Sequence, residues 1–144
     1  FKFTKAILAG EKIQIFNHGK HRRDFTYVDD IVEGVIRVLD KPAQPSMSWN
    51  SDEPDSSSSS APWKIYNIGN NSPVDLMDYV KAVESALGLK ADKEFLPLQP
   101  GDVPATHADT TALEKYIGFR PETNVEEGVS RFVSWYKDYY KLSF

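Results

Sequence analysis

Apolar residues along the 144-residue chain follow two different spacings, one typical of helices and one typical of strands. Recurrence at three- and four-residue intervals predicts helices at the N-terminus, at about 30–40, 72–87 and 125–140, and a shorter one between Asp109 and Gly118. Alternation predicts strands at KIQIF (12–16), DFTYV (24–28), WKIYNIG (63–69) and EFLPL (94–98). Helices interleaved with short strands predict an α/β fold, or an α+β arrangement if the chain is an isolated fragment.

Two of these helices carry recognisable boundary residues. We expect Asp30 to cap the second helix, with Glu33 three residues on as in a capping box. Ser72 is the expected N-cap of the third helix, and Pro73 suits its first position because the N–H there has no helical partner to lose. Gly88 is the expected C-cap of the same helix.

Residues 43–62 follow neither spacing. This stretch is rich in Ser, Pro and acidic residues and includes five consecutive serines. It has too little apolar surface to offset the entropy of ordering it, so we interpret it as a mobile insertion rather than a linker. The predicted organisation is therefore one domain over 1–144 with this insertion. Its strands are few and short for a free-standing sheet, which indicates a piece of something larger.

Composition narrows the classes of function. The formal net charge is −4 and the pI is about 5.4, which argues against a general surface for nucleic acids or anionic membranes. The absence of cysteine excludes thiolate catalysis, disulfides and Cys-type zinc sites, and is consistent with a cytoplasmic protein. The histidines show no metal-ligand spacing, and no apolar run approaches the roughly 20 residues of a membrane span.

A local basic cluster interrupts this acidic chain. Residues 18–23, HGKHRR, contain two histidines, one lysine and two arginines. A guanidinium can make two charge-assisted hydrogen bonds to one phosphate, and Arg23 adjoins a predicted strand that would hold its backbone in place. Arg23 is therefore the candidate anion-binding residue, while Lys20, His21 and Arg22 are expected to face water. A solvated surface turn is the alternative interpretation.

The loop QPGDVP (99–104) is the second candidate. Pro-Gly favours a tight bend, and Asp102 after it can accept hydrogen bonds from hydroxyl groups such as those of a ribose. A plain turn with a solvated Asp is the alternative. The sequence lacks GxGxxG, GxxxxGK[ST], GxSxG and a Tyr followed four positions on by Lys. We therefore expect no catalytic, cofactor-binding or metal-binding residues in this chain.

Three stretches nevertheless resemble a known family: RRDFTYVDDIVEGVIRVLDKPA, SSAPWKIYNIGNNSPVDLMDYVKAVESALG and LPLQPGDVPATHADTTALEKYIGFRPETNVEEGVSRFVSWYKDYY. In the order RDFTYVDD, YNIGN, PGDV and ADT they are similar to the C-terminal, substrate-binding part of extended short-chain dehydrogenase/reductase enzymes, and among them to bacterial UDP-glucuronate 4-epimerases. The resemblance implies a full-length enzyme whose N-terminal Rossmann domain, absent here, binds NAD and carries the catalytic Tyr and Lys.

The implied reaction is conversion of UDP-glucuronate to UDP-galacturonate by oxidation at C4, rotation of the keto sugar and reduction from the other face. The chain alone would then be inactive. Three alternatives within the superfamily stay open: an epimerase for another UDP-sugar, a dehydratase or a decarboxylase. A non-catalytic binding module is a fourth.

The resemblance also assigns roles residue by residue. Gln14 and Phe16 occupy the strand edge that meets the uracil. Arg23 matches the arginine that contacts the diphosphate, Asp102 the acid near the ribose, and Thr106 a position close to the hexose.

Gln99 departs from the family pattern, because many relatives carry Arg directly before Pro-Gly-Asp as a second phosphate contact. Arg22 or the absent half would then have to supply that charge. The resemblance further implies a homodimeric full-length enzyme acting in polysaccharide precursor synthesis. An isolated fragment would expose the face meant for its Rossmann partner and is expected to self-associate.

Overall fold

The computed structural model describes residues 1–142, and these fall into two compact units. Unit 1 contains Phe1–Phe25, Ser72–His107 and the chain from Thr123 on. Unit 2 contains Thr26–Asn71 and Ala108–Glu122. Each unit is thus assembled from segments far apart in the sequence, whereas the sequence predicts one domain over 1–144.

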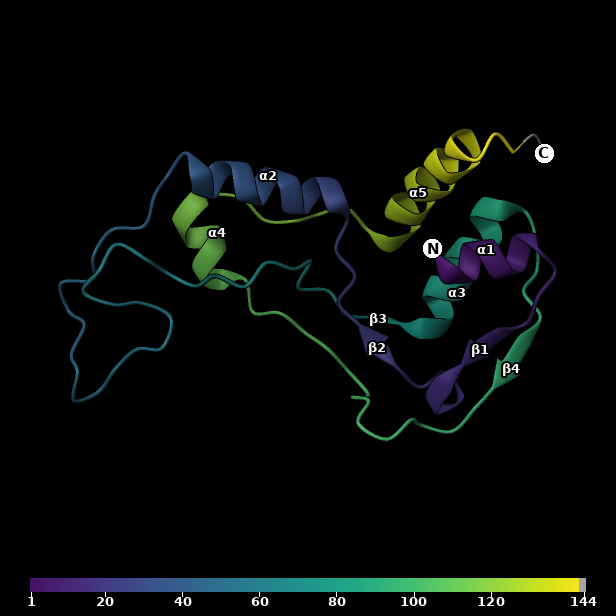
Figure 1. The fold of residues 1–144 in the computed structure, drawn as a ribbon, viewed down its shortest axis with the longest axis horizontal. Coiled ribbons are helices and arrows are strands. Elements are labelled where there is room, and N and C mark those ends of the chain that lie inside the picture. The colour runs from purple at the N-terminus through teal and green to yellow at the C-terminus, as the bar shows by residue number, and fades with distance from the viewer. Residues whose placement is uncertain (143–144) are drawn as a thin grey trace. The chain divides into compact units, whose positions relative to one another are not determined.

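Unit 1 is built around three helices, α1 (Lys2–Leu8), α3 (Leu76–Leu87) and α5 (Val125–Tyr139). Helix α3 packs against both α5 and α1 (Figure 1). The apolar residues at helical spacing on α1, α3 and α5 meet in one hydrophobic core, as that spacing predicts for these three helices. Its largest members are Ile7, Ile13, Ile15, Val80, Val83, Leu87, Val125, Val129 and Val133.

Strand β1 (Ile13–Ile15) pairs in parallel with β4 (Lys93–Phe95). Ile13 and Ile15 are buried while Gln14 is exposed, as the alternation predicts. The tight turn η1 (Phe16–Gly19) follows β1 directly, and Asn17 and His18 take positive φ angles of 52° and 47°. The predicted strand 12–16 is thus present in shortened form, whereas the predicted strand 94–98 overlaps β4 only at Glu94 and Phe95.

The predicted strand 24–28 is wrong in position. The observed strand, β2 (Arg22–Arg23), lies just before it and pairs antiparallel with β3 (Val74–Asp75). The apolar residue Val28 instead opens helix α2 (Val28–Leu39), because Tyr27 already accepts the first helical hydrogen bond, from the N–H of Ile31 at 3.2 Å.

Both predicted N-caps are also wrong. Helix α2 begins two residues before Asp30, which lies in the first turn, where its charge favours the positive end of the helix dipole. Helix α3 begins at Leu76 instead of Pro73, because pairing with β2 keeps Val74–Asp75 in a strand. Its C-cap is Gly88 at φ 69°, as predicted.

Unit 2 consists of α2, the short helix α4 (Thr111–Ile117) and the long connection after α2. The two helices lie side by side (Figure 1). Gly34 on α2 allows a close approach of Ile68, since a Cβ at Gly34 would collide with the Cδ1 of Ile68. Tyr66 stacks on Tyr116 of α4, with ring centroids 5.1 Å apart. The end of α4 at Gly118 is as predicted.

The predicted strand WKIYNIG (63–69) does not form within residues 1–142. Lys64 makes an isolated antiparallel bridge with Ser58, and the rest of the segment belongs to no sheet of the described chain. A strand requires a second strand to satisfy its N–H and C=O groups, and none of the described segments pairs along this one.

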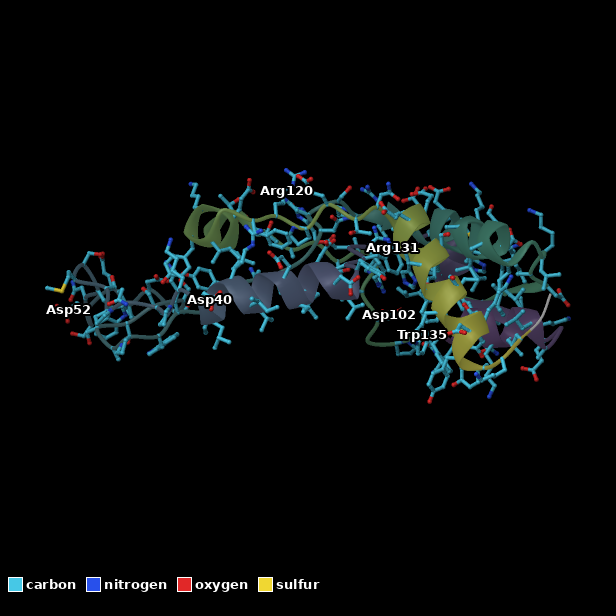
Figure 2. The ribbon with its side chains drawn as sticks, turned by 90° about the horizontal axis from the view of Figure 1, so that it is seen from above. Asp40, Asp52, Asp102, Arg120, Arg131 and Trp135 are labelled. Carbon is cyan, nitrogen blue, oxygen red and sulfur yellow. The ribbon has the colours of Figure 1, made fainter. Side chains whose placement is uncertain are left out.

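The Ser-rich stretch contains local hydrogen bonds. It leaves α2 after Asp40 and extends into a loop that carries Asp52 (Figure 2). The Asp55 carboxylate accepts hydrogen bonds from the Ser58 hydroxyl at 2.6 Å and the Ser57 N–H at 2.9 Å. Chiefly the Ser58 bond, and then those from Ser57, lower the pKa of Asp55 to about 2. These bonds span two or three residues only, and the mobility of the stretch stays a prediction.

Candidate functional site

Strand β2 lies between β3 and the loop 102–106 of unit 1. On the loop side, the N–H of Arg22 donates to the carbonyl of Pro104 at 2.9 Å, and the N–H of Thr106 donates to the carbonyl of Arg22 at 3.2 Å. These two backbone bonds hold the loop beside the strand. As a result, Asp102 and Thr106, about 80 residues away in sequence, reach the basic cluster.

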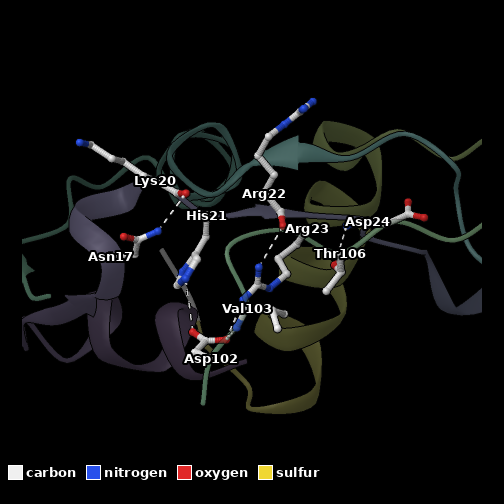
Figure 3. Close-up of polar contacts among 9 residues, drawn as sticks. All are labelled: Asn17, Lys20, His21, Arg22, Arg23, Asp24, Asp102, Val103 and Thr106. Carbon is white, nitrogen blue, oxygen red and sulfur yellow. Dashed lines mark hydrogen bonds and ion pairs between the residues drawn. The ribbon is translucent and has the colours of Figure 1, made fainter. Parts of the chain in front are cut away.

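Arg23 and Asp102 form the centre of the site (Figure 3). The Nη2 of Arg23 lies 3.0 Å from the Oδ1 of Asp102, which also accepts the N–H of Val103 at 2.9 Å. The Nη1 of Arg23 donates to the carbonyl of Arg22 at 3.0 Å. Both side chains of the pair are partly buried, 25% and 32% exposed, so the guanidinium is held in one orientation.

His21 is the residue that the sequence analysis misplaced. It was expected to face water, yet it is only 5% exposed, and its Nε2 lies 3.3 Å from the Oδ2 of Asp102. The alignment is too poor for a hydrogen bond, and Nε2 has no other hydrogen-bond partner within the described residues. The signal that identifies it is alternation. Side chains two positions apart share one side of a strand, so an inward Arg23 implies an inward His21.

Lys20 and Arg22 are exposed, as predicted. Figure 3 shows both directed away from Asp102, on the side opposite to His21 and Arg23. Arg22 has partners of its own: its Nε lies 3.1 Å from Asp75, and its Nη2 donates to the carbonyl of Pro73 at 3.0 Å. Arg22 was considered as the source of a second positive charge for the phosphate. Its guanidinium instead points towards β3, away from that of Arg23.

Two further candidates lie on the 99–106 loop. The Oγ1 of Thr106 accepts the N–H of Asp24 at 3.3 Å, which places its side chain next to the end of β2. The carbonyl of Gln99 accepts the N–H of Asp102 at 3.2 Å, while the Gln99 side chain is exposed. Gly101 makes this turn with φ +83°, a conformation that favours glycine.

The remaining two candidates lie on β1 and on the turn that follows it. Gln14 is the central residue of β1, and its amide is 3.5 Å from the Glu94 carboxylate of β4, at the limit of a hydrogen bond. Phe16 is partly exposed at the start of η1. The structure therefore brings Arg23, Asp102 and Thr106 together on β2 and its neighbouring loop, and leaves Gln14 on β1 and Phe16 at the start of η1.

Within 1–142, no group of three or more His, Asp or Glu side chains is arranged to hold a metal ion. None of the helices described there has both the length and the apolar character needed to cross a membrane.

Comparison with solved structures defines the class of fold. The chain superposes on UDP-glucuronic acid 4-epimerase from Bacillus cereus, solved in complex with UDP-glucuronic acid and NAD, with a TM-score of 0.74 and 24% sequence identity. The match covers 96% of this chain and 39% of that one. The chain thus shares the fold of the corresponding part of that enzyme.

Sequence comparison identifies the family. The family described as GDP-mannose 4,6 dehydratase matches residues 1–132, and the chain belongs to it. Protein CapI of Staphylococcus aureus is 55% identical, and a probable UDP-glucuronate 4-epimerase of Rhizobium meliloti is 43% identical, each over 98% of this chain. The chain spans 42% of the length of each of these relatives.

Proposed function

We propose that this chain is the UDP-sugar-binding part of a longer NAD-dependent nucleotide-sugar 4-epimerase that converts UDP-glucuronate to UDP-galacturonate. The observation that carries the proposal is the Arg23 guanidinium, fixed on β2 by Asp102 at 3.0 Å with Thr106 beside the same strand. The relative from R. meliloti and the B. cereus structure, whose names specify UDP-glucuronate 4-epimerases, support the choice of sugar and reaction.

Arg23 would contact the diphosphate. An arginine has five N–H donors, and the contacts to Asp102 and the Arg22 carbonyl involve one N–H on each of its two Nη atoms. Donors therefore remain for phosphate oxygens without breaking the ion pair that orients the group. Burial of the pair lowers the entropy lost when an anion binds, because the guanidinium is already held in one orientation.

Asp102 would accept hydrogen bonds from the ribose hydroxyls. Its Oδ1 receives Arg23 and the N–H of Val103, while its Oδ2 faces His21 without a well-aligned bond. Carboxylate oxygens accept several hydrogen bonds each, so the group can hold Arg23 and a sugar hydroxyl together. Thr106 is proposed to lie close to the hexose.

The other two assignments concern the base. Gln14 and Phe16 are proposed to meet the uracil through the edge of β1. Gln99, at the position before Pro-Gly-Asp, carries no charge. Among the described residues, Arg23 is therefore the one arginine whose side chain pairs with Asp102.

NAD does not fit the residues described here. A dinucleotide pyrophosphate is bound by a glycine-rich turn between a strand and the N-terminus of a helix. In unit 1, β3 runs into α3 with no intervening loop, and its N-cap is Asp75, whose charge opposes a phosphate. We therefore assign no reaction step to this chain, whose residues bind and orient the UDP-sugar. NAD and the catalytic Tyr and Lys are proposed to belong to the rest of the longer protein.

Calorimetric titration with UDP tests the binding role. Replacing Arg23 by Gln removes charge-assisted hydrogen bonds worth about 1.5–3 kcal/mol, so the dissociation constant should rise about 10- to 150-fold. Arg22→Gln is the matched control. It removes the same charge from the neighbouring residue, whose side chain pairs with Asp75. Equal losses in the two variants, or no loss in Arg23→Gln, would remove the proposed role of Arg23.

The family name itself favours a second candidate, a sugar-nucleotide 4,6-dehydratase. Incubating the longer protein with a panel of UDP- and GDP-sugars and analysing the products separates the possibilities. Exchange at C4 supports the epimerase, loss of water the dehydratase, and release of carbon dioxide a decarboxylase. Nucleotide binding without turnover of any sugar supports a binding module. A homodimeric assembly, a cytoplasmic location and a role in polysaccharide synthesis stay predictions.

A further inference from the structure

His21 is a buried polar side chain to which the proposed function assigns no role. It is 5% exposed, and its Nε2 has no hydrogen-bond partner within residues 1–142. A buried polar atom that is left unpaired costs free energy, so it calls for a structural or a functional explanation. The group that faces this nitrogen is the carboxylate of Asp102, whose Oδ2 lies 3.3 Å away.

The backbone brings His21 and Asp102 together. The carbonyl of His21 accepts the N–H of Leu76 at 2.8 Å, which fixes the start of β2 against α3. The N–H of Arg22 donates to the carbonyl of Pro104 at 2.9 Å, two residues after Asp102. The imidazole and the carboxylate therefore meet because of where the strand and the loop run, and Figure 3 shows them directed toward one another.

The two oxygens of Asp102 are held unequally. Oδ1 accepts hydrogen bonds from Arg23 at 3.0 Å and from the N–H of Val103 at 2.9 Å. A carboxylate bound through one oxygen can still swing about that oxygen, so these two bonds do not fix the direction of Oδ2. A donor at Oδ2 would fix it, and the Nε2 of His21 is close enough to become that donor after a small rotation of either group.

The charge of Asp102 also decides which form of the His21 ring suits this place. A neutral imidazole carries a proton on one nitrogen and a lone pair on the other. A lone pair 3.3 Å from a carboxylate oxygen is repelled, whereas an N–H at the same distance is attracted. The surroundings therefore favour a proton on Nε2, the form of the ring that can donate to Asp102.

We infer that His21 is a positioning residue of the nucleotide site, whose Nε2–H holds the Oδ2 of Asp102 and so turns the carboxylate toward the ribose hydroxyls. The inference rests on the proposed function, in which Asp102 accepts hydrogen bonds from the ribose. A site that is built to pair with a hydroxyl discriminates against an analogue that lacks it. His21 therefore sets how strongly the chain prefers a nucleotide with ribose hydroxyls over one without them.

Calorimetric titration with UDP and with 2′,3′-dideoxy-UDP, which lacks both ribose hydroxyls, tests this preference. The unaltered chain should bind UDP at least about tenfold more tightly, because a hydrogen bond to a charged group contributes that factor or more. His21→Gln places an amide N–H close to the position of Nε2 and should keep the preference. His21→Leu has a side chain of similar size without a donor, and its preference should fall to about twofold or less.

A double replacement shows whether His21 acts through Asp102. Asp102→Ala alone should weaken UDP binding, and adding His21→Leu should weaken it by less than about twofold more, because the group that the histidine holds is already gone. A histidine that only fills space in the fold would instead add its full loss to that of Asp102→Ala. Thermal unfolding of each variant measures any effect on the fold separately.

Nitrogen-15 NMR of the histidine rings tests the same contact in the unaltered chain. The 144 residues contain three histidines, few enough for the ring signals of His21 to be assigned. Its Nε2 should carry a proton, and the signal of that nitrogen should move when UDP binds. A neutral ring that is protonated on Nδ1 alone would overturn the inference.

The titrations separate a failure of this inference from a failure of the proposed function. Suppose that UDP binds and that binding depends on Arg23. If His21→Leu then shows the same preference as the unaltered chain, or if the unaltered chain binds the two nucleotides equally, the inference is wrong and the diphosphate role of Arg23 stands. If the unaltered chain does not bind UDP, the proposed function fails and this inference fails with it.

Discussion

The two units of this chain differ in where their apolar side chains lie. In unit 1, the inward faces of α1, α3, α5 and β1 meet in one core. In unit 2, α2 is as apolar as those helices but leaves one whole face exposed. The same helical periodicity therefore occurs on buried faces in unit 1 and on an exposed face in unit 2. Periodicity shows that a helix has an apolar face and does not show what covers it.

The candidate site follows this difference. Arg23, Asp102 and His21 belong to unit 1, where the strand that carries Arg23 is paired on both sides. A binding group must be held firmly to be effective, and packed elements provide that. Unit 2 instead leaves apolar side chains of α2 exposed.

The largest expected effect compares two leucines. Leu87 is the last residue of α3 and 5% exposed, whereas Leu39 is the last residue of α2 and 76% exposed. Leu87→Ala should lower the free energy of unfolding by about 2–5 kcal/mol, because it leaves a cavity in the core. Leu39→Ala in the 144-residue chain should change it by less than about 0.5 kcal/mol. Denaturant titration followed by circular dichroism measures both.

One result would contradict this comparison between the two leucines. A loss for Leu39→Ala as large as that for Leu87→Ala would show that the exposed face of α2 at Leu39 is covered in the 144-residue chain.

A smaller effect compares two ion pairs. Glu84 on α3 is 4% exposed and accepts hydrogen bonds from the Lys93 ammonium and the N–H of Ala91. Glu33 on α2 pairs with Arg37 at 2.6 Å, with both side chains more than 40% exposed. Glu84→Gln should cost about 1–3 kcal/mol, since it leaves the Lys93 charge partly buried without its partner. Glu33→Gln should cost no more than about 0.5 kcal/mol.

Acid dependence gives an independent measurement of the same pair. Burial alone would raise the pKa of Glu84, but the bonds from Lys93 and Ala91 and the charges of Lys93 and Lys90 outweigh it and lower the pKa below 4.5. The folded pKa is then lower than the unfolded one. The stability that Glu84 contributes is therefore complete above its ordinary pKa and is lost as the pH falls through the folded value. Unfolding between neutral pH and pH 3 should depend less on pH in Glu84→Gln.

The sequence was sufficient to predict most helices, for a physical reason. Val80, Val83 and Leu87, or Val125, Val129 and Val133, carry a local signal that does not depend on a partner. Strands need a partner, and the sequence does not say which segments will be adjacent. Segment 63–69 was therefore predicted as a strand from its alternation, yet the described chain pairs no strand with it.

For the candidate site, the sequence indicated individual residues but not their proximity. Arg23, Asp102 and Thr106 were identified separately, but their proximity depends on the backbone bonds that place loop 102–106 beside β2. His21 was missed because a histidine in a basic turn resembles its exposed neighbours. Only the register of a two-residue strand, which starts at Arg22, indicates that it points the other way.

The smallest expected effect compares two asparagines that make the same kind of bond. The Asn124 side chain caps α5 by accepting the N–H of Glu127 at 2.9 Å, and the Asn50 side chain accepts the N–H of Asp52 at 3.1 Å in the Ser-rich stretch. Asn124→Ala should cost about 1 kcal/mol, because it exposes an unpaired donor at the start of a core helix. Asn50→Ala should cost less than about 0.5 kcal/mol if the stretch is mobile as predicted, because a bond within a mobile segment contributes little to the free energy of unfolding. Thermal unfolding measures both, and a cost for Asn50→Ala equal to that for Asn124→Ala would show that the stretch 43–62 is ordered.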